Sequence, residues 1–309
     1  MNEENPPSGP PPTRCGYVAV VGRPNVGKST LLNNILDQKL SIVTDKPQTT
    51  RNRILAVFNE GDAQVIFLDT PGLHSPRASL GRYMIEAAES AIAEADVCAW
   101  LIDMGGRRKE GLDEDEQEVA ERLAASKTPV IIGLNKIDLL KKDKAALLPM
   151  MEAISNLDGV TAVLPISGQK GEGVREFLDA ITPLLPEGPK LYPEDMLSEQ
   201  AERFFVAELV REALTDLTRQ EIPYHSAVVI DKFVEETKQV VIYASIHVER
   251  TSQRAIVIGK GGHLIKEIGR RAREAAEALL GMPVFLKLHV EVSPGWTQSV
   301  DQLKKMGYQ

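Results

Sequence analysis

The residues with the clearest chemical meaning form a glycine-rich run near the start of the chain. The run follows the apolar segment 18–21, opens a helical pattern, and consists of Gly22, Arg23, Pro24, Asn25, Val26, Gly27, Lys28, Ser29 and Thr30. This order is typical of a P-loop, whose backbone N–H groups and helix N-terminus bind phosphate oxygens. We expect Lys28 to bridge the β- and γ-phosphates of a nucleotide and Ser29 to bind Mg²⁺. The alternative, a glycine turn before an ordinary helix, is disfavoured because strand, loop and helix follow one another in the required order.

A second polar group, Asp69-Thr70-Pro71-Gly72, follows the apolar run 65–68. Ligands of open α/β sheets bind at the carboxyl ends of the strands, where Asp69 is expected. We therefore expect Asp69 to hold Mg²⁺ through a water molecule and the Gly72 amide to contact the γ-phosphate. The same four residues also make a good turn, so the assignment depends on the P-loop that precedes them.

The third group selects the base. Asn135, Lys136 and Asp138 follow the apolar run 130–134, and one carboxylate can accept both N1–H and N2–H of guanine. Adenine lacks those donors and would leave Asp138 unpaired, so the pattern favours GTP over ATP. Ser167 and Gly168 follow the next apolar run and are expected to contact the guanine carbonyl through the backbone.

A glycine cluster in the last third of the chain predicts a different ligand. Its loop consists of Gly259, Lys260, Gly261 and Gly262, and it resembles the GXXG loop of KH domains, which clamps the backbone of about four nucleotides. Segment 250–273 carries seven basic residues and one acid, although the whole chain has a net charge of -8. We expect RNA contacts from the loop together with Arg254, Lys266 and Arg270. A lone GXXG is a weak signal, and a basic run is often only a solvated helix face.

The apolar pattern predicts the elements that position these groups. Strands at 18–21, 65–68, 97–102, 130–134 and 162–166 alternate with helices at 28–37, 80–95, 113–125, 144–155 and 174–185. This pattern predicts a mostly parallel α/β sheet with helices on both faces, and 54–58 is expected to add one antiparallel strand. A smaller α+β module should follow, with a helix at 198–219 and strands at 227–233, 239–247 and 284–292.

Proline and polarity predict the domain boundaries. Residues 183–193 contain four prolines, which deny a helix its hydrogen bonds and stiffen the chain. We therefore expect a disordered tail at 1–14, a GTP-binding domain at 15–185, a linker at 186–197 and an RNA-binding domain at 198–309. The tail is polar and proline-rich, without the apolar core of a signal peptide.

Composition bounds the class of protein. Hydrophobic residues make up 43% of the 309, and no apolar run approaches the roughly 20 residues of a membrane span. Cys15 and Cys98 are the only cysteines and lack metal-ligand spacing, so no structural zinc is expected. A cytoplasmic location fits best, and any membrane contact should be peripheral and sensitive to salt.

The four nucleotide-binding segments resemble the Era and TrmE-related branch of the translation-factor-like GTPases. Followed by a type II KH domain, they resemble the bacterial Era family from about Cys15 onward, including Tyr192–Asp195 and Gly295–Trp296. One departure is Gly168, where the family usually has alanine; the backbone contacts should survive it. The resemblance implies GTP and GDP as ligands, binding near the 3′ end of 16S ribosomal RNA, and a role in assembly of the small (30S) ribosomal subunit.

The same resemblance implies the groups that act in hydrolysis. A switch I threonine should bind Mg²⁺, and we favour Thr50 over Thr49 in Gln48-Thr49-Thr50-Arg51. Lys28, Thr50 and Gly72 are then the expected catalytic groups. Ras-like enzymes place a water-orienting glutamine where this chain has Leu73, so slow intrinsic turnover is expected. A potassium ion near Asn25, as in TrmE proteins, is a hypothesis for how turnover is accelerated.

Two other functions stay open at this point. The chain could be an RNA-binding chaperone whose nucleotide site is structural, although its motif residues are all intact. It could also be a signalling GTPase at a membrane, although it lacks a lipidation motif. Trp296 is expected to anchor a terminal segment in the core, with stacking on an RNA base as the alternative.

Overall fold

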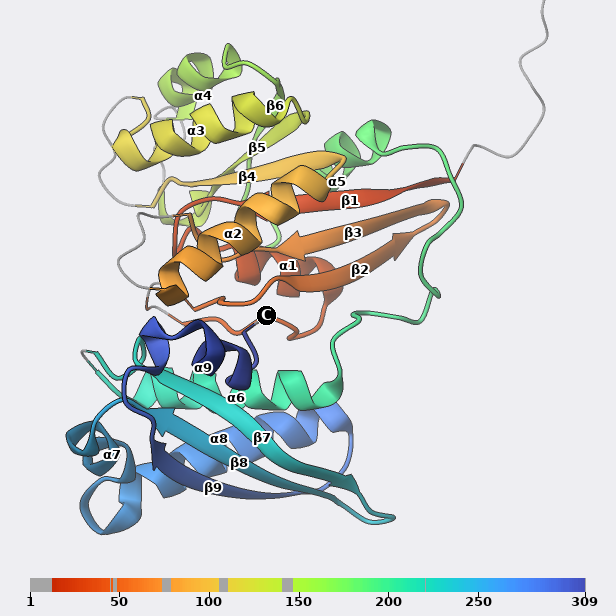
Figure 1. Ribbon diagram of the computed structural model, residues 1–309. Coiled ribbons are helices and arrows are strands. Elements are labelled where there is room, and N and C mark those ends of the chain that lie inside the picture. The colour runs from red at the N-terminus through yellow and green to blue at the C-terminus, as the bar shows by residue number, and fades with distance from the viewer. Residues whose placement is uncertain are drawn as a thin grey trace, which may run out of the picture.

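The computed structural model describes residues 13–44, 46, 49–73, 79–105, 111–140, 147–219 and 221–308, and it contains two sheets (Figure 1). Residues 1–12 of the expected tail lie outside the described residues, while Arg14 already belongs to the first strand. The larger sheet has the order β2-β3-β1-β4-β5-β6. Its strands are β1 (Arg14–Val21), β2 (Ile54–Glu60), β3 (Ala63–Asp69), β4 (Val97–Asp103), β5 (Val130–Asn135) and β6 (Val160–Pro165). β2 pairs antiparallel with β3 and the other pairs are parallel, as the sequence predicts.

Helices cover both faces of this sheet. The core on one face contains side chains from α2 (Ser79–Glu94), α3 (Glu114–Ser126) and α4 (Leu147–Ser155). The core on the other face contains side chains from α1 (Lys28–Leu36) and α5 (Val174–Ile181), which a short 3₁₀ turn at Thr182–Leu184 extends. Burial on both faces explains why the central strands are apolar along nearly their whole length. Residues 144–146 of the expected fourth helix lie outside the described part of the chain.

The second module is an α+β unit built on a three-stranded sheet. Its elements are α6 (Glu202–Leu217), β7 (Ser226–Glu235), β8 (Val240–Val248), α7 (Thr251–Ile258), α8 (His263–Leu280), β9 (Val284–Val292) and α9 (Val300–Lys305). β8 pairs antiparallel with β7 and parallel with β9, and α6 and α8 pack together over one face. Among the described residues, no helix is long and apolar enough to cross a membrane.

The two modules contact each other through the connecting segment and the C-terminus. Gln64 in β3 is completely buried, and its Oε1 accepts hydrogen bonds from the backbone N–H of Leu191 (2.8 Å) and Tyr192 (2.9 Å). The segment expected to be a linker is thus attached to the larger sheet. The chain end lies between the modules (Figure 1), where Trp296 and Tyr308 pack with Leu80 and Met84 of α2. Trp296 is fully buried and stacks on Tyr308 at 5.9 Å, so it anchors the C-terminal segment and is not available to an RNA base.

Candidate nucleotide and RNA sites

The P-loop lies between β1 and α1, at the carboxyl end of the larger sheet. Gly27 adopts a φ of 98°, and a Cβ there would lie 2.4 Å from Asn135, so only glycine fits. The Lys28 ammonium is buried and donates to the carbonyls of Gly22 (3.1 Å) and Arg23 (3.0 Å). A cavity of about 410 Å³ opens beside the loop, lined by Pro24, Asn25, Gly27, Lys28, Ser29, Thr30, Ile42, Val43, Thr44, Thr49, Thr50, Gly72, Asn135, Lys136, Asp138, Leu139 and Gln169.

Burial shifts the pKa values of two charged groups beside this cavity. Burial lowers the pKa of Lys28 to about 8, opposed by the nearby Asp69 carboxylate. Burial also raises the pKa of Asp69, opposed by the charge of Lys28 and by hydrogen bonds from Ser41, Ser29 and Thr50. Both buried charges therefore gain from a ligand of opposite sign. The lysine favours an anion such as a phosphate, and the aspartate favours a cation.

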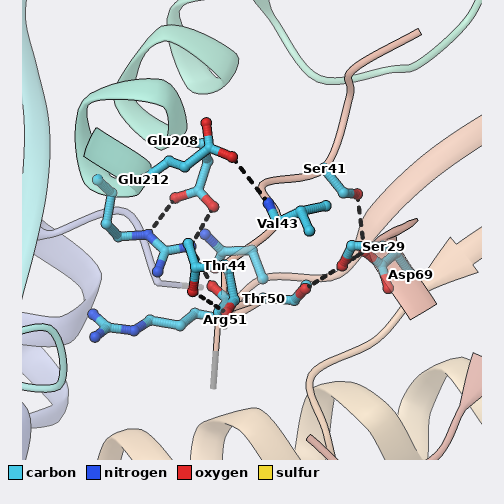
Figure 2. A network of polar contacts seen from close by, with 12 residues as sticks. Ser29, Ser41, Val43, Thr44, Thr50, Arg51, Asp69, Glu208 and Glu212 are labelled. Carbon is cyan, nitrogen blue, oxygen red and sulfur yellow. Dashed lines mark hydrogen bonds and ion pairs between the residues drawn. The ribbon is translucent and has the colours of Figure 1, made fainter. Parts of the chain in front are cut away.

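Side-chain oxygens of Ser29, Thr50 and Asp69 converge beside the P-loop. Ser29 Oγ lies 2.9 Å from Thr50 Oγ1 and donates to Asp69 Oδ2 at 2.9 Å (Figure 2). The other carboxylate oxygen, Asp69 Oδ1, is buried and has no hydrogen-bond partner among the described residues. Hydroxyl and carboxylate oxygens are the ligands that Mg²⁺ prefers, and it takes the rest from water and phosphate. The residues therefore fit a magnesium ion.

The residues expected to recognise guanine also lie together. Ser167 Oγ donates to Asp138 Oδ1 at 2.6 Å, which fixes the carboxylate at the cavity wall. Asn135 connects three loops, because its Nδ2 donates to the Val26 carbonyl (2.7 Å) and its Oδ1 accepts from the Gly168 amide (2.8 Å). The Asn135 side-chain amide therefore links the P-loop to the loop that contains Gly168.

The glycine loop of the smaller module connects α7 to α8. Gly259 has a φ of 72°, and a Cβ there would lie 2.8 Å from Leu264. Gly261 and Gly262 also have positive φ, but no atom of the described residues lies within 4 Å of a Cβ at either. The backbone of this loop is thus open to a ligand that approaches closely, as a phosphate would.

The basic residues around that loop differ in what they contact. Lys260, Lys266 and Arg254 are exposed. Arg270 instead forms ion pairs along α8 with Glu267 (2.7 Å) and Glu274 (2.8 Å). Hydrogen bonds from Arg270, and then from Arg271, lower the pKa of Glu267 to about 2. The charge of Arg270 is therefore partly compensated before any RNA arrives.

Known families match both parts of the chain. Residues 17–136 match the family described as 50S ribosome-binding GTPase, and residues 221–297 match the family described as KH domain. The GTPase Era of Staphylococcus haemolyticus is 43% identical over 296 residues, which cover 96% of this chain and 97% of that protein. The GTPase Era of Syntrophus aciditrophicus is 44% identical over 297 residues, covering 96% and 95%. The chain belongs to the Era family of GTPases.

Two crystal structures of Era proteins share the whole fold. One is Era in complex with MgGDPNP and nucleotides 1506–1542 of 16S ribosomal RNA, with a TM-score of 0.89 and 41% identity. The other is a variant of Aquifex aeolicus Era bound to GDP.AlF4⁻, with a TM-score of 0.89 and 42% identity. Each match covers 96% of this chain and 99% of the other. They confirm the predicted fold class, an α/β P-loop GTPase domain followed by a KH domain.

The departure at Gly168 has a visible neighbour. A Cβ at this position would lie 3.1 Å from Leu31 in α1. The alanine expected here from the family resemblance would require Leu31 to shift by a few tenths of an ångström. The contact between the Gly168 amide and Asn135 uses only the backbone, so it does not depend on that side chain.

Some expected contacts of this Era-family protein look different in three dimensions. Arg23 does not line the cavity; its guanidinium pairs with Asp113 and with Asp115 (2.9 Å) at the start of α3. Lys136 lines the cavity, and its ammonium group pairs with Asp103 at 2.6 Å. Ser41, which was not among the predicted site residues, donates to Asp69 Oδ2 at 2.8 Å. No spacing pattern identifies Ser41, because its partner is 28 positions away.

Proposed function

We propose that the protein is a GTP-hydrolysing switch that binds 16S ribosomal RNA near its 3′ end and assists assembly of the 30S subunit. The observation that carries this proposal is the presence, in one chain, of a cavity lined by Lys28, Thr50 and Asp138 and of an open GXXG loop. An Era protein of the same fold binds MgGDPNP and nucleotides 1506–1542 of 16S ribosomal RNA, which supports the same ligands here.

Each group in the GTP site has a separate task. Lys28 would bind the β- and γ-phosphates, Asp138 the guanine edge, and the Gly72 amide the γ-phosphate. Gly72 fits this task, because it lies against Pro24 of the P-loop and a Cβ there would be 2.6 Å from the Pro24 nitrogen. Ser29, Thr50 and Asp69 would hold Mg²⁺, which supplies neutralisation of the phosphate charge when bound.

Intrinsic hydrolysis should be slow because of Leu73. This side chain is only 5% exposed and packs in the core beneath the sheet. It has no polar atom to orient an attacking water, so the task of the Ras glutamine must fall to another group.

Potassium is the candidate that we propose for acceleration. Asn25 belongs to the P-loop, lines the cavity and has a φ of 63°. We expect turnover in potassium buffer to exceed turnover in sodium buffer of equal ionic strength by about tenfold, because a cation there would stabilise developing phosphate charge. Phosphate release measured in both buffers checks this, with Asn25→Ala expected to remove the difference. Equal turnover in both buffers would contradict the potassium hypothesis.

Coupling between the two sites is the final part of the proposed function. GTP would order the loops around Thr50 and Gly72, realign the GTP-binding domain (residues 15–185) relative to the KH domain (residues 198–309), and expose the RNA groove. Hydrolysis would reset the protein. If GTP favours RNA binding, RNA must favour GTP by the same factor.

The test is the binding of a short RNA from the 3′ end of 16S ribosomal RNA at fixed salt. We expect tighter binding with a non-hydrolysable GTP analogue than with GDP, and a loss of about a hundredfold or more in Gly261→Asp. The aspartate would add strain at φ 61° and negative charge where the phosphate backbone lies.

Gly281→Asp is the matched control for that test. Gly281 has a φ of 66° with nothing near a Cβ, but it ends α8 on the side remote from the GXXG loop. The Gly281→Asp variant should therefore carry the same backbone strain and added charge with little effect on RNA binding. Equal binding with both nucleotides would leave two independent sites, and unchanged RNA binding in Gly261→Asp would mean that the loop is not the RNA site.

The other functions make different predictions. An RNA chaperone with a structural nucleotide site would show no GTP turnover. Peripheral association with a membrane, which we propose only as an additional location, should be released by raised salt.

A further inference from the structure

The loop between α1 and β2 forms one wall of the nucleotide cavity and is held from behind by the KH module. Glu212 of α6 accepts hydrogen bonds from the Val43 backbone N–H (3.1 Å) and from Lys39 Nζ (2.6 Å). Arg211 of α6 donates to the Thr49 carbonyl. Val43 and Thr49 both line the nucleotide cavity. The cavity wall is therefore attached to a helix of the other module (Figure 2).

Arg51 makes a buried contact across this boundary. It is only 2% exposed, and its guanidinium donates to the carbonyls of Pro223 (2.5 Å) and Ser226 (2.7 Å) and to the Tyr308 hydroxyl (3.0 Å). All three acceptors belong to the C-terminal module. A buried cation is costly unless it is hydrogen-bonded, so these contacts fix where Arg51 can lie.

Arg51 follows directly after the proposed magnesium ligand. Thr50 Oγ1 contacts Ser29 Oγ at 2.9 Å, whereas the Arg51 side chain extends away from it (Figure 2). Consecutive Cα atoms are about 3.8 Å apart across a rigid peptide bond. Removing Arg51 from its site would therefore also move the Thr50 hydroxyl.

A buried ion pair prepares the second attachment. Arg211 is 2% exposed and binds Glu208, one turn earlier in α6, through Nε (2.8 Å) and Nη2 (2.5 Å). The bidentate geometry fixes the plane of the guanidinium, and Nη2 also reaches the Thr49 carbonyl. Arg211 thus presents a pre-oriented donor to the residue before Thr50.

From these contacts we infer that Arg51 and Arg211 are positioning residues for Thr50, so that the KH module completes the magnesium side of the GTP site. The inference rests on the proposed role of Thr50 in GTP binding. Arg51 does not line the nucleotide cavity, so it acts through Thr50 and not on the nucleotide. A ligand that stabilises this contact between the KH module and the loop would strengthen Mg²⁺–GTP binding, and by reciprocity GTP would strengthen the binding of that ligand, as proposed for RNA.

The test compares Arg51→Ala with Arg53→Ala in the full chain without RNA. Arg53 is two positions away and pairs with Glu94 on the surface, so it controls for loss of a nearby arginine. In Mg²⁺, Arg51→Ala should lower the affinity for a fluorescent non-hydrolysable GTP analogue by about tenfold. Loss of one well-placed metal ligand is expected to lower affinity by roughly that factor. The affinity for GDP should change by less than about twofold, because Thr50 is expected to engage only with the γ-phosphate present. Arg53→Ala should change neither.

A double-mutant cycle with Thr50→Ala distinguishes an effect of Arg51 on the position of Thr50 from a general destabilisation of the fold. If Arg51 acts through Thr50, Arg51→Ala should have almost no further effect on analogue affinity in the Thr50→Ala background. Arg51→Lys should recover part of the affinity, because it keeps the charge and some donors. Thermal unfolding checks the fold, and Arg51→Gln gives the same comparison if the alanine variant does not fold.

Three results would overturn the inference. They are unchanged analogue affinity in a folded Arg51 variant, an equal loss for GDP and the analogue, and an undiminished effect in the Thr50→Ala background. Failure of the proposed GTP site would appear separately, as a wild-type protein that does not bind the analogue in Mg²⁺.

Discussion

Replacing Asp138 with asparagine is expected to change the base that the protein accepts from guanine to xanthine. The carboxylate offers two acceptors to N1–H and N2–H of guanine, whereas the asparagine amide offers one acceptor and one donor. Xanthine has N1–H and a carbonyl at C2, which match that amide. Ser167 Oγ, which donates to Asp138 Oδ1, should keep the acceptor oxygen in place. We expect GTP affinity to fall by about three orders of magnitude and XTP affinity to rise by a similar factor.

Competition of GTP, XTP and ATP against a labelled analogue measures this exchange. Asp158→Asn is the matched control, because Asp158 is exposed in the turn before β6 and does not line the cavity. ATP should bind weakly to every variant. Adenine has an acceptor at N1, whereas both the aspartate and the asparagine present an acceptor oxygen there, so no hydrogen bond can form. A variant that still prefers GTP would show that Asp138 does not read the base.

The nucleotide site was predictable to the extent that its residues are close in sequence. Lys28 and Ser29 are adjacent, and Asn135 precedes Asp138 by three positions, so spacing alone identifies them. Asp69 could be placed because parallel strands bring their carboxyl ends to one edge of the sheet. Thr50 needed the resemblance to the Era family, and the structure places its hydroxyl 2.9 Å from that of Ser29.

Contacts between the modules were not predictable, because the partners are far apart along the chain. Arg51 and Tyr308 are separated by 257 positions, and Gln64 and Tyr192 by 128. Local patterns describe periodicity and turns but contain no information about which distant polar group will satisfy a buried one. Arg51 reads as a solvated loop residue, and Gln64 as an ordinary strand residue, until the tertiary structure is known.

The basic region near the GXXG loop shows a different limit. The basic segment 250–273 ends just before Glu274 and Glu277. These two acids pair with Arg270 and Arg273, which lie four positions earlier. The i,i+4 rule predicts both pairs from sequence. Applying it would have ranked Lys260 and Lys266 above Arg270 as RNA contacts.

Replacing Lys28 with alanine is expected to lower GTP turnover by about a thousandfold or more, because the triphosphate loses its buried counter-charge. Affinity for GTP should fall as well. Lys232→Ala is the matched control, since Lys232 is exposed on β7. Phosphate release under single-turnover conditions measures the chemical step directly. Residual turnover equal to wild type would place hydrolysis elsewhere, and no turnover in either protein would favour the RNA chaperone.

The same variant should not weaken the fold when nucleotide is absent, which separates catalysis from stability. Burial lowers the pKa of Lys28 from 10.5 to about 8, so at pH 7 the buried charge opposes folding. The unfolded chain binds more protons than the folded one between those pKa values, and stability should rise with pH across that window. In Lys28→Ala that rise should be smaller and the unfolding temperature at pH 7 equal to or above that of wild type. A lower unfolding temperature without nucleotide would mean that Lys28 stabilises the empty loop, and the loss of turnover would then not identify its role in hydrolysis.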